Sequence, residues 1–124
     1  MSSYSEKEYG IFSRLFILKE YSEENLKKLS NINIGIIGIG GIGCPLSRYL
    51  VGSGIRKLII ADGDLIEEKN INRQILFDLG DVGKKKVEVA ENKLKLINTN
   101  CNIVKIDSYV DGKNIDQLSN CSII

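Results

Sequence analysis

The order strand, glycine turn, helix, strand over residues 34–62 constrains the fold more than any other feature of this chain. Ile34–Ile37 is rich in β-branched residues, which is typical of a central parallel strand buried on both faces. The turn Gly38–Gly43 leads into a helix that begins near Gly41, and 57–62 is the second strand. This order predicts an α/β fold, namely a Rossmann-like, doubly wound and mainly parallel sheet.

The remaining sequence places further elements around this unit. Residues 5–30 have the spacing of short amphipathic helices, with Ser22 as a helix cap, and residues 63–81 resemble a long crossover loop with a short helix. A helix from Lys84 to Asn98, a strand over 103–106 and a short helix over 114–118 follow. Residues 122–124 begin a fourth strand beside the first, in the order 3-2-1-4. We therefore expect an N-terminal helical arm over 1–30 and a nucleotide-binding domain over 31–124, truncated at its C-terminus.

Composition limits the class of protein. The 124 residues are 43% apolar and 27% charged, which suits one domain with a modest core. A net charge of +1 gives no general attraction to nucleic acid or to an anionic membrane, so we expect neither as a partner. The chain has no apolar stretch of about 18 residues and no export signal at its start, which favours the cytoplasm.

Cysteine and histidine usage limits the chemistry. Cys44, Cys101 and Cys121 have no Cys-x-x-Cys spacing, so we interpret them as reduced thiols and assign no residue as a metal ligand. Histidine is absent, which removes the usual general base. Catalysis by this chain would then rest mainly on electrostatics and positioning.

The glycine turn and Asp62 predict a nucleotide site. Gly38 would form the tight turn, Gly40 and Gly41 would let backbone amides approach phosphate, and Gly43 would allow close contact between helix and strand. Asp62, at the tip of the second strand, would accept hydrogen bonds from ribose hydroxyls. The alternatives are a turn kept for packing and a solvated turn acid. A second acid two residues later, Asp64, joins the candidate set although its alternative role is to cap the loop.

Asn70, Arg73 and Lys86 separate phosphate chemistry from hydride transfer. A triphosphate attacked at its α-phosphorus needs fixed cations and amide donors around oxygens that gain charge. Arginine provides a planar fork and lysine a point charge. Taken alone, Lys84-Lys85-Lys86 could be a solvated helix face, so the hypothesis rests on Lys86 acting together with Arg73.

These motifs together resemble the ThiF/MoeB family, bacterial relatives of ubiquitin-activating enzymes. The resemblance runs from about Phe12 to the end and rests on an ordered series of motifs, which begins with Gly38-Ile-Gly-Gly-Ile-Gly-Cys44-Pro45 and continues with Asp62-Gly-Asp64, Asn70-Ile-Asn-Arg73-Gln74 and Gly83-x-x-Lys86-Val87. It implies ATP- and Mg²⁺-dependent adenylation of a carboxylate, typically the C-terminal glycine of a ubiquitin-like sulfur carrier, by a homodimer.

The resemblance also implies residue roles. Asp62 would hold the ribose, Gly41 the phosphates, and Asn70, Arg73 and Lys86 the triphosphate. Phe12-Ser13-Arg14 resembles the family's Tyr-Ser-Arg-Gln arm, whose arginine reaches the partner subunit's ATP site, although Leu15 replaces the glutamine. A magnesium-binding aspartate, paired Cys-x-x-Cys motifs and the sheet half that docks the carrier would all follow the strand beginning at Ser122. We therefore expect this chain to be the nucleotide-binding part of such an enzyme.

Two other functions stay open from the sequence. The glycine turn and Asp62 also suit an NAD-binding domain of the dehydrogenase type. A shortened relative could instead act as a dimerisation or interaction domain without catalysis, since an incompletely covered first strand favours pairing with another chain.

Overall fold

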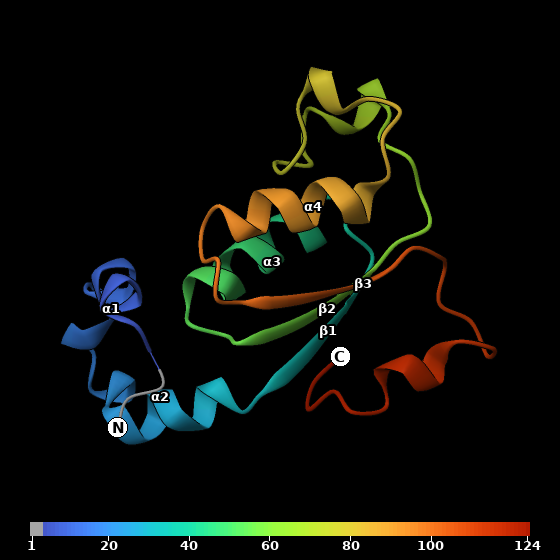
Figure 1. Ribbon diagram of the computed structural model, residues 1–124. Coiled ribbons are helices and arrows are strands. Elements are labelled where there is room, and N and C mark those ends of the chain that lie inside the picture. Colours follow the sequence, from blue (N-terminus) through green and yellow to red (C-terminus); the bar gives the residue numbers. More distant parts are fainter. Residues whose placement is uncertain (1–3) are drawn as a thin grey trace.

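A three-stranded parallel sheet lies at the centre of the computed structural model, which describes residues 4–124 (Figure 1). The strands are β1 (Asn33–Ile37), β2 (Lys57–Ala61) and β3 (Asn102–Ile106), in the order β1-β2-β3. Ile34 pairs with Leu58, and Leu58 pairs with Ile103, so the strands start level with one another. Their carboxyl ends therefore lie at one edge of the sheet, where the segments that follow all three strands meet.

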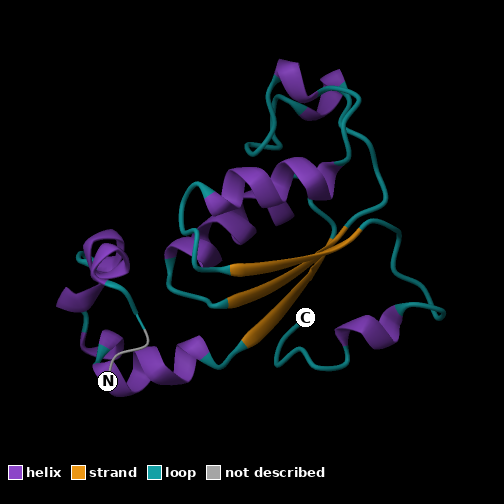
Figure 2. Ribbon diagram, viewed as in Figure 1, coloured by secondary structure: helices purple, strands orange, loops and turns teal. Residues whose placement is uncertain are grey.

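Both long helices cover the same face of the sheet (Figures 1 and 2). They are α3 (Gly43–Gly52), which connects β1 to β2, and α4 (Lys86–Lys95), which precedes β3. Pro45 lies in the first turn of α3, where its missing N–H costs no helical hydrogen bond. The main hydrophobic core fills the space between these helices and the sheet, and it includes Leu58, Ile60, Val51 and Leu94.

The opposite face is covered by the end of the chain. A 3₁₀ turn, η5 (Ile115–Leu118), contributes Leu118 to a small cluster with Ile59 and Ile106. The chain then returns to β1, where Ile34 and Ile123 form a parallel bridge and Gly35 N donates to Ile123 O at 2.9 Å. The predicted order is confirmed for the three strands, as β3-β2-β1, and the isolated bridge at Ile123 lies at the predicted fourth position. The prediction that the first strand is buried on both faces was wrong at Ile37, which is 50% exposed because this face is only partly covered.

The N-terminal arm has a small core of its own, formed by Tyr4, Phe12 and Leu26. Its helices are α1 (Glu6–Phe12) and α2 (Glu23–Ser30), separated by the 3₁₀ turns η1 (Leu15–Ile17) and η2 (Lys19–Tyr21). Ser22 caps α2 as predicted, accepting from Asn25 N at 3.3 Å. The arm lies near the amino ends of the strands (Figure 1).

The crossover between β2 and α4 differs from the sequence prediction in two places. It contains two 3₁₀ turns, η3 (Glu68–Asn70) and η4 (Leu79–Asp81), rather than the one short helix predicted. The helix begins at Lys86 rather than Lys84 because the preceding residues pair with the segment after β2, with Leu65 and Lys85 forming an antiparallel bridge. Within residues 4–124, no helix combines the length and apolarity that crossing a membrane requires.

Candidate functional site

The glycine turn connects the carboxyl end of β1 to the start of α3. Gly38 has φ +95°, the left-handed conformation expected of a tight turn, and its N–H donates to Ala61 O at 2.7 Å. A Cβ on Gly43 would lie 2.0 Å from Gly38 O, so glycine is required where the helix start meets the turn. These two glycines are explained by the backbone of the turn itself.

Gly40 and Gly41 have no such structural cause. Neither has a positive φ, and a Cβ on either residue would come no closer than 3.8 Å to the atoms outside the turn. Alanine would fit at both positions without strain. A glycine where alanine fits leaves the backbone amides open to close approach, which is the property that phosphate binding uses.

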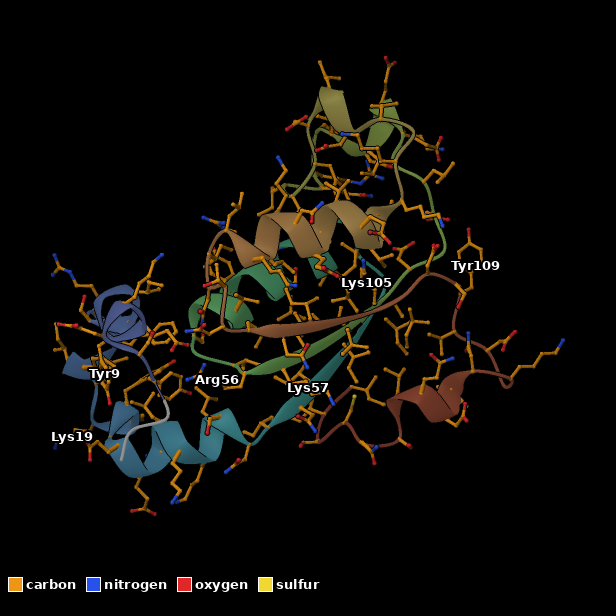
Figure 3. All side chains as sticks on the ribbon, in the orientation of Figure 1. Tyr9, Lys19, Arg56, Lys57, Lys105 and Tyr109 are labelled. Atoms are coloured by element: carbon orange, nitrogen blue, oxygen red, sulfur yellow. The ribbon has the colours of Figure 1, made fainter. Side chains whose placement is uncertain are left out.

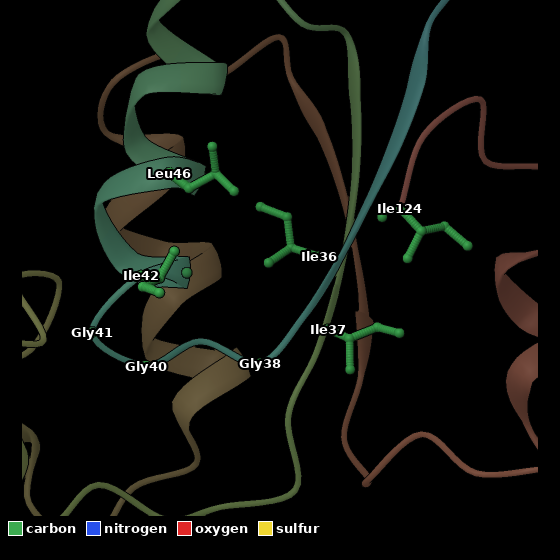
Figure 4. A pocket seen from close by; sticks show the side chains of 10 residues that line it. Ile36, Ile37, Gly38, Gly40, Gly41, Ile42, Leu46 and Ile124 are labelled. Atoms are coloured by element: carbon green, nitrogen blue, oxygen red, sulfur yellow. The ribbon is translucent and has the colours of Figure 1, made fainter.

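A cavity of about 580 Å³ adjoins this turn (Figure 4). It is lined by the end of β1, the turn, Leu46 of α3 and Ile124. β1 continues into α3 on one face of the sheet, whereas the Ile123 segment beside β1 is reached from the opposite face. The cavity between them therefore lies at the topological switch point. Doubly wound folds bind their ligands at such points.

The carboxylate of Asp62 holds the turn in place. Its Oδ2 accepts from Ile39 N and its Oδ1 from Asp64 N, both at 2.8 Å, and the residue is only 9% exposed. An ionised carboxylate offers about four lone-pair sites. Asp62 therefore retains capacity to accept from a ligand, and its role toward ribose stays a prediction.

Arg73 lies beside the turn, with its Cγ and Cδ 3.8 Å from the Cβ position of Gly41. Its guanidinium donates to Lys69 O at 2.8 Å and Asn72 Oδ1 at 3.1 Å, and the side chain is exposed. Asn70 is buried and shapes the loop that carries Arg73, since its Oδ1 accepts from Glu67 N at 2.9 Å. The structure thus brings Arg73 to the turn and gives Asn70 a structural contact within the loop.

Lys86 is the first residue of α4 and is only 5% exposed, so the alternative of a solvated helix face is wrong for this lysine. Its Nζ lies 3.4 Å from Asp64 Oδ2. Burial raises the pKa of the Cys44 thiol at the start of α3, and the charge of Lys86 is among the effects that oppose this rise. Neither Lys86 nor Arg73 lines the cavity itself; Arg73 reaches it only through its contact with Gly41.

Sequence reasoning assigned no role to Gln74, which the structure places at the turn. The residue is 4% exposed, its Nε2 lies 3.8 Å from the Cβ position of Gly40, and its buried Oε1 has no hydrogen-bond partner within residues 4–124. A buried unsatisfied acceptor costs about 1–3 kcal/mol. The sequence signal that could have identified Gln74 as a site residue is its position directly after Arg73 in the motif Asn70-Ile-Asn-Arg73-Gln74.

Arg14 is not brought to this site within one chain. It is exposed on the arm, and the arm contacts the loops that precede β2 and β3, through Gly54, Arg56 and Asn98. Five-residue strands separate the two ends of the sheet by roughly 16 Å. Figure 3 shows Arg56 near the arm and Tyr109 at the other end of the strands.

The comparisons with known proteins agree with this geometry. A profile of the ThiF family matches residues 12–124. The chain belongs to the ThiF family. This confirms the predicted ThiF/MoeB membership and, with it, the Rossmann-like fold class.

Three similar proteins illustrate the match. The probable molybdopterin-synthase adenylyltransferase of Gracilaria tenuistipitata var. liui is 37% identical over 117 residues, covering 94% of this chain and 33% of the relative. The sulfur carrier protein ThiS adenylyltransferase of Escherichia coli K12 is 29% identical over 109 residues, covering 88% of this chain and 43% of the relative. The crystal structure of E. coli MccB with ATP matches with a TM-score of 0.79 and 34% identity, covering 87% of this chain and 34% of that chain. The chain thus spans less than half the length of these proteins.

Proposed function

We propose that this chain binds ATP and forms the nucleotide-binding part of an enzyme that adenylates a carboxylate. The observation that carries the proposal is the open backbone at Gly40 and Gly41, which are glycines without a conformational or packing cause, next to the stem of Arg73. The ATP named in the MccB structure and the adenylyltransferases among the relatives support it.

The residues fit ATP in the following way. The amides of Gly40 and Gly41 face the phosphates, Asp62 accepts from the ribose, and Arg73 exchanges its contact with Lys69 O for a phosphate oxygen. Lys86 adds a second cation from the start of α4. Within residues 4–124 no group of three acidic, histidine or cysteine side chains could hold a metal ion. Mg²⁺ would accompany the phosphates of ATP, as it commonly does, and neutralise part of their charge.

The proposed reaction needs little acid–base chemistry. A carboxylate oxygen attacks the α-phosphorus in line, the bond from that phosphorus to the bridging oxygen of the β-phosphate breaks, and pyrophosphate leaves with the electron pair. The attacking carboxylate is already ionised at neutral pH, so no base is required. Arg73 and Lys86 offset the charge that develops on the phosphate oxygens. A chain without histidine can support this reaction.

The proposed carboxylate is the C-terminus of a ubiquitin-like sulfur carrier, because one relative is named for adenylating the sulfur carrier ThiS. We further propose a homodimer, in which Arg14 of each subunit reaches the partner's site, since Arg14 lies far from the site of its own chain. Use of ATP and the three free cysteines favour the cytoplasm.

Nucleotide competition tests the first part of the proposal. Mg-ATP is expected to displace a fluorescent ATP analogue from the protein at lower concentration than NAD does. The reverse order would contradict ATP binding and support the dehydrogenase-type alternative.

Pyrophosphate exchange in the presence of a sulfur carrier tests the chemistry. One preorganised donor contributes about 3 kcal/mol to such a transition state, so Arg73→Ala should lose about a hundredfold in rate. Arg48→Ala is the matched control, because Arg48 is another exposed arginine and, unlike Arg73, is not among the nearest neighbours of Gly40 or Gly41. Equal rates for the two variants would contradict the role of Arg73.

A further inference from the structure

The segment after β2 and the segment before α4 form a short antiparallel pairing next to the glycine turn. Ile66 N donates to Lys84 O at 2.8 Å, and Lys86 N donates to Asp64 O at 3.1 Å. These backbone contacts fix the first residue of α4 beside Asp64. The position of Lys86 is therefore set by the fold and does not depend on its own side-chain contact.

This position is unfavourable for a lysine. The amino end of a helix carries a partial positive charge and favours acidic side chains. Lys86 adds a full positive charge there and is 5% exposed, so it also loses hydration. Its ion-pair partner among the described residues is Asp64, whose side chain is 47% exposed, with 3.4 Å between Nζ and Oδ2. Asp64 is therefore the solvent-exposed member of the pair and Lys86 the buried one.

Tyr109, which follows β3, contacts the carboxylate oxygen of Asp64 that Lys86 does not contact. Its hydroxyl donates to Asp64 Oδ1, and its ring packs on Gly63, where a Cβ would come within 3.0 Å of Tyr109 Cδ2. The hydrogen bond from Tyr109, together with the charge of Lys86, lowers the pKa of Asp64, so this carboxylate is ionised at neutral pH. Tyr109 lies at the carboxyl end of the sheet (Figure 3).

We propose that Asp64 is the counterion that Lys86 exchanges for a nucleotide phosphate, and that Tyr109 is a positioning residue that keeps Asp64 in place. This inference rests on the proposed function, because it takes the nucleotide to bind at the adjacent turn. Asp64 then lowers the affinity for phosphate-bearing ligands while leaving the affinity for the nucleoside unchanged. It keeps the Lys86 ammonium paired when no phosphate is bound.

The measurement is the ratio of the dissociation constant for adenosine to that for Mg-ATP, obtained by calorimetry. In this ratio any contact with the base or the ribose cancels. Asp64→Asn should raise the ratio about fivefold, since partly exposed ion pairs contribute about 1 kcal/mol. Tyr109→Phe should raise it by a smaller factor of about two, because the carboxylate stays but is less firmly held.

A neighbouring ion pair provides matched controls. Lys85 and Asp107 form a surface pair one residue away, so Asp107→Asn removes the same charge and should leave the ratio unchanged. In a Lys86→Met background, Asp64→Asn should have no effect, whereas it should keep its effect in a Lys85→Met background.

The outcomes separate the two proposals. An unchanged or lowered ratio in Asp64→Asn, or an increase that persists in Lys86→Met, overturns the exchange while ATP binding by the wild type still supports the proposed function. A wild type that binds ATP no better than adenosine overturns both. Should Asp64→Asn fail to fold, Tyr109→Phe in the Lys85→Met and Lys86→Met backgrounds gives the same decision.

Discussion

Buried polar groups are fully paired at one end of the sheet and incompletely paired at the other. At the amino end, Glu8 is 1% exposed and is fully paired: Arg56 lies at 3.0 Å, and Asn98 and Ser5 N donate at 3.1 and 2.8 Å. At the carboxyl end, Gln74 Oε1 has no hydrogen-bond partner among the described residues, and Lys86 is paired with a half-exposed carboxylate.

This contrast indicates that the amino end of the sheet serves stability and the carboxyl end serves binding. A satisfied buried ion pair fixes one arrangement of the chain, and it joins the arm to the loops before β2 and β3. Unsatisfied groups lower the free energy of unfolding, and under the proposed function they become satisfied when the nucleotide binds. Substitutions of the paired polar side chains at the amino end should therefore change stability, and those of the polar side chains around the glycine turn should change binding.

Glu8→Ala should cause the largest loss of stability. It leaves the partly buried Arg56 without its carboxylate and removes the capping box of α1, so we expect a loss of about 4 kcal/mol in urea unfolding. Glu24→Ala, which breaks an exposed pair with Lys28, should change stability by at most about 0.5 kcal/mol. A loss at Glu8 no larger than the loss at Glu24 would contradict the contrast.

The Glu8 carboxylate should also make the stability of the protein depend on pH. Burial alone would raise the pKa of Glu8, but the hydrogen bonds from Ser5 N and Asn98 outweigh it and bring the pKa below 4.5. Its contribution to stability is therefore complete at neutral pH and is lost as the pH falls through this lowered pKa. Unfolding curves of the wild type should show this acid-side loss, and those of Glu8→Gln should show less of it. Parallel pH profiles would contradict the assignment.

Gly43→Ala should reduce stability by about 3 kcal/mol, because its Cβ would overlap Gly38 O, a backbone atom. Gly52→Ala, in the last turn of the same helix, meets nothing within 4 Å and should be neutral or slightly stabilising. Thermal unfolding of the two variants compares them directly. Equal midpoints would mean that the turn can relax around the added methyl group.

Gln74→Met should have a smaller effect of opposite sign. Replacing a buried, unsatisfied amide with an apolar side chain of similar size should stabilise the protein by about 1 kcal/mol. ATP affinity should fall at the same time. A destabilised variant would show that the amide is already satisfied in the free protein.

Sequence periodicity predicted the strands, α3, the capping of α2 and the strand order, because these features depend on local patterns and on general rules of connection. It misplaced the start of α4, which depends on pairing between Leu65 and Lys85, residues 20 positions apart. It also missed Gln74, since the burial of one amide follows from tertiary packing. Arg73 and Lys86 were chosen as a pair, yet the structure assigns them different surroundings, one exposed and one buried.

ATP binding by Gly41→Ala is the decisive measurement for phosphate binding at the glycine turn, because alanine fits at this position in the free protein. We expect a midpoint of unfolding within experimental error of the wild type and an ATP affinity at least about tenfold weaker, since the added methyl group covers the amides. An affinity equal to that of the wild type, in a variant that is equally stable, would contradict phosphate binding at the glycine turn.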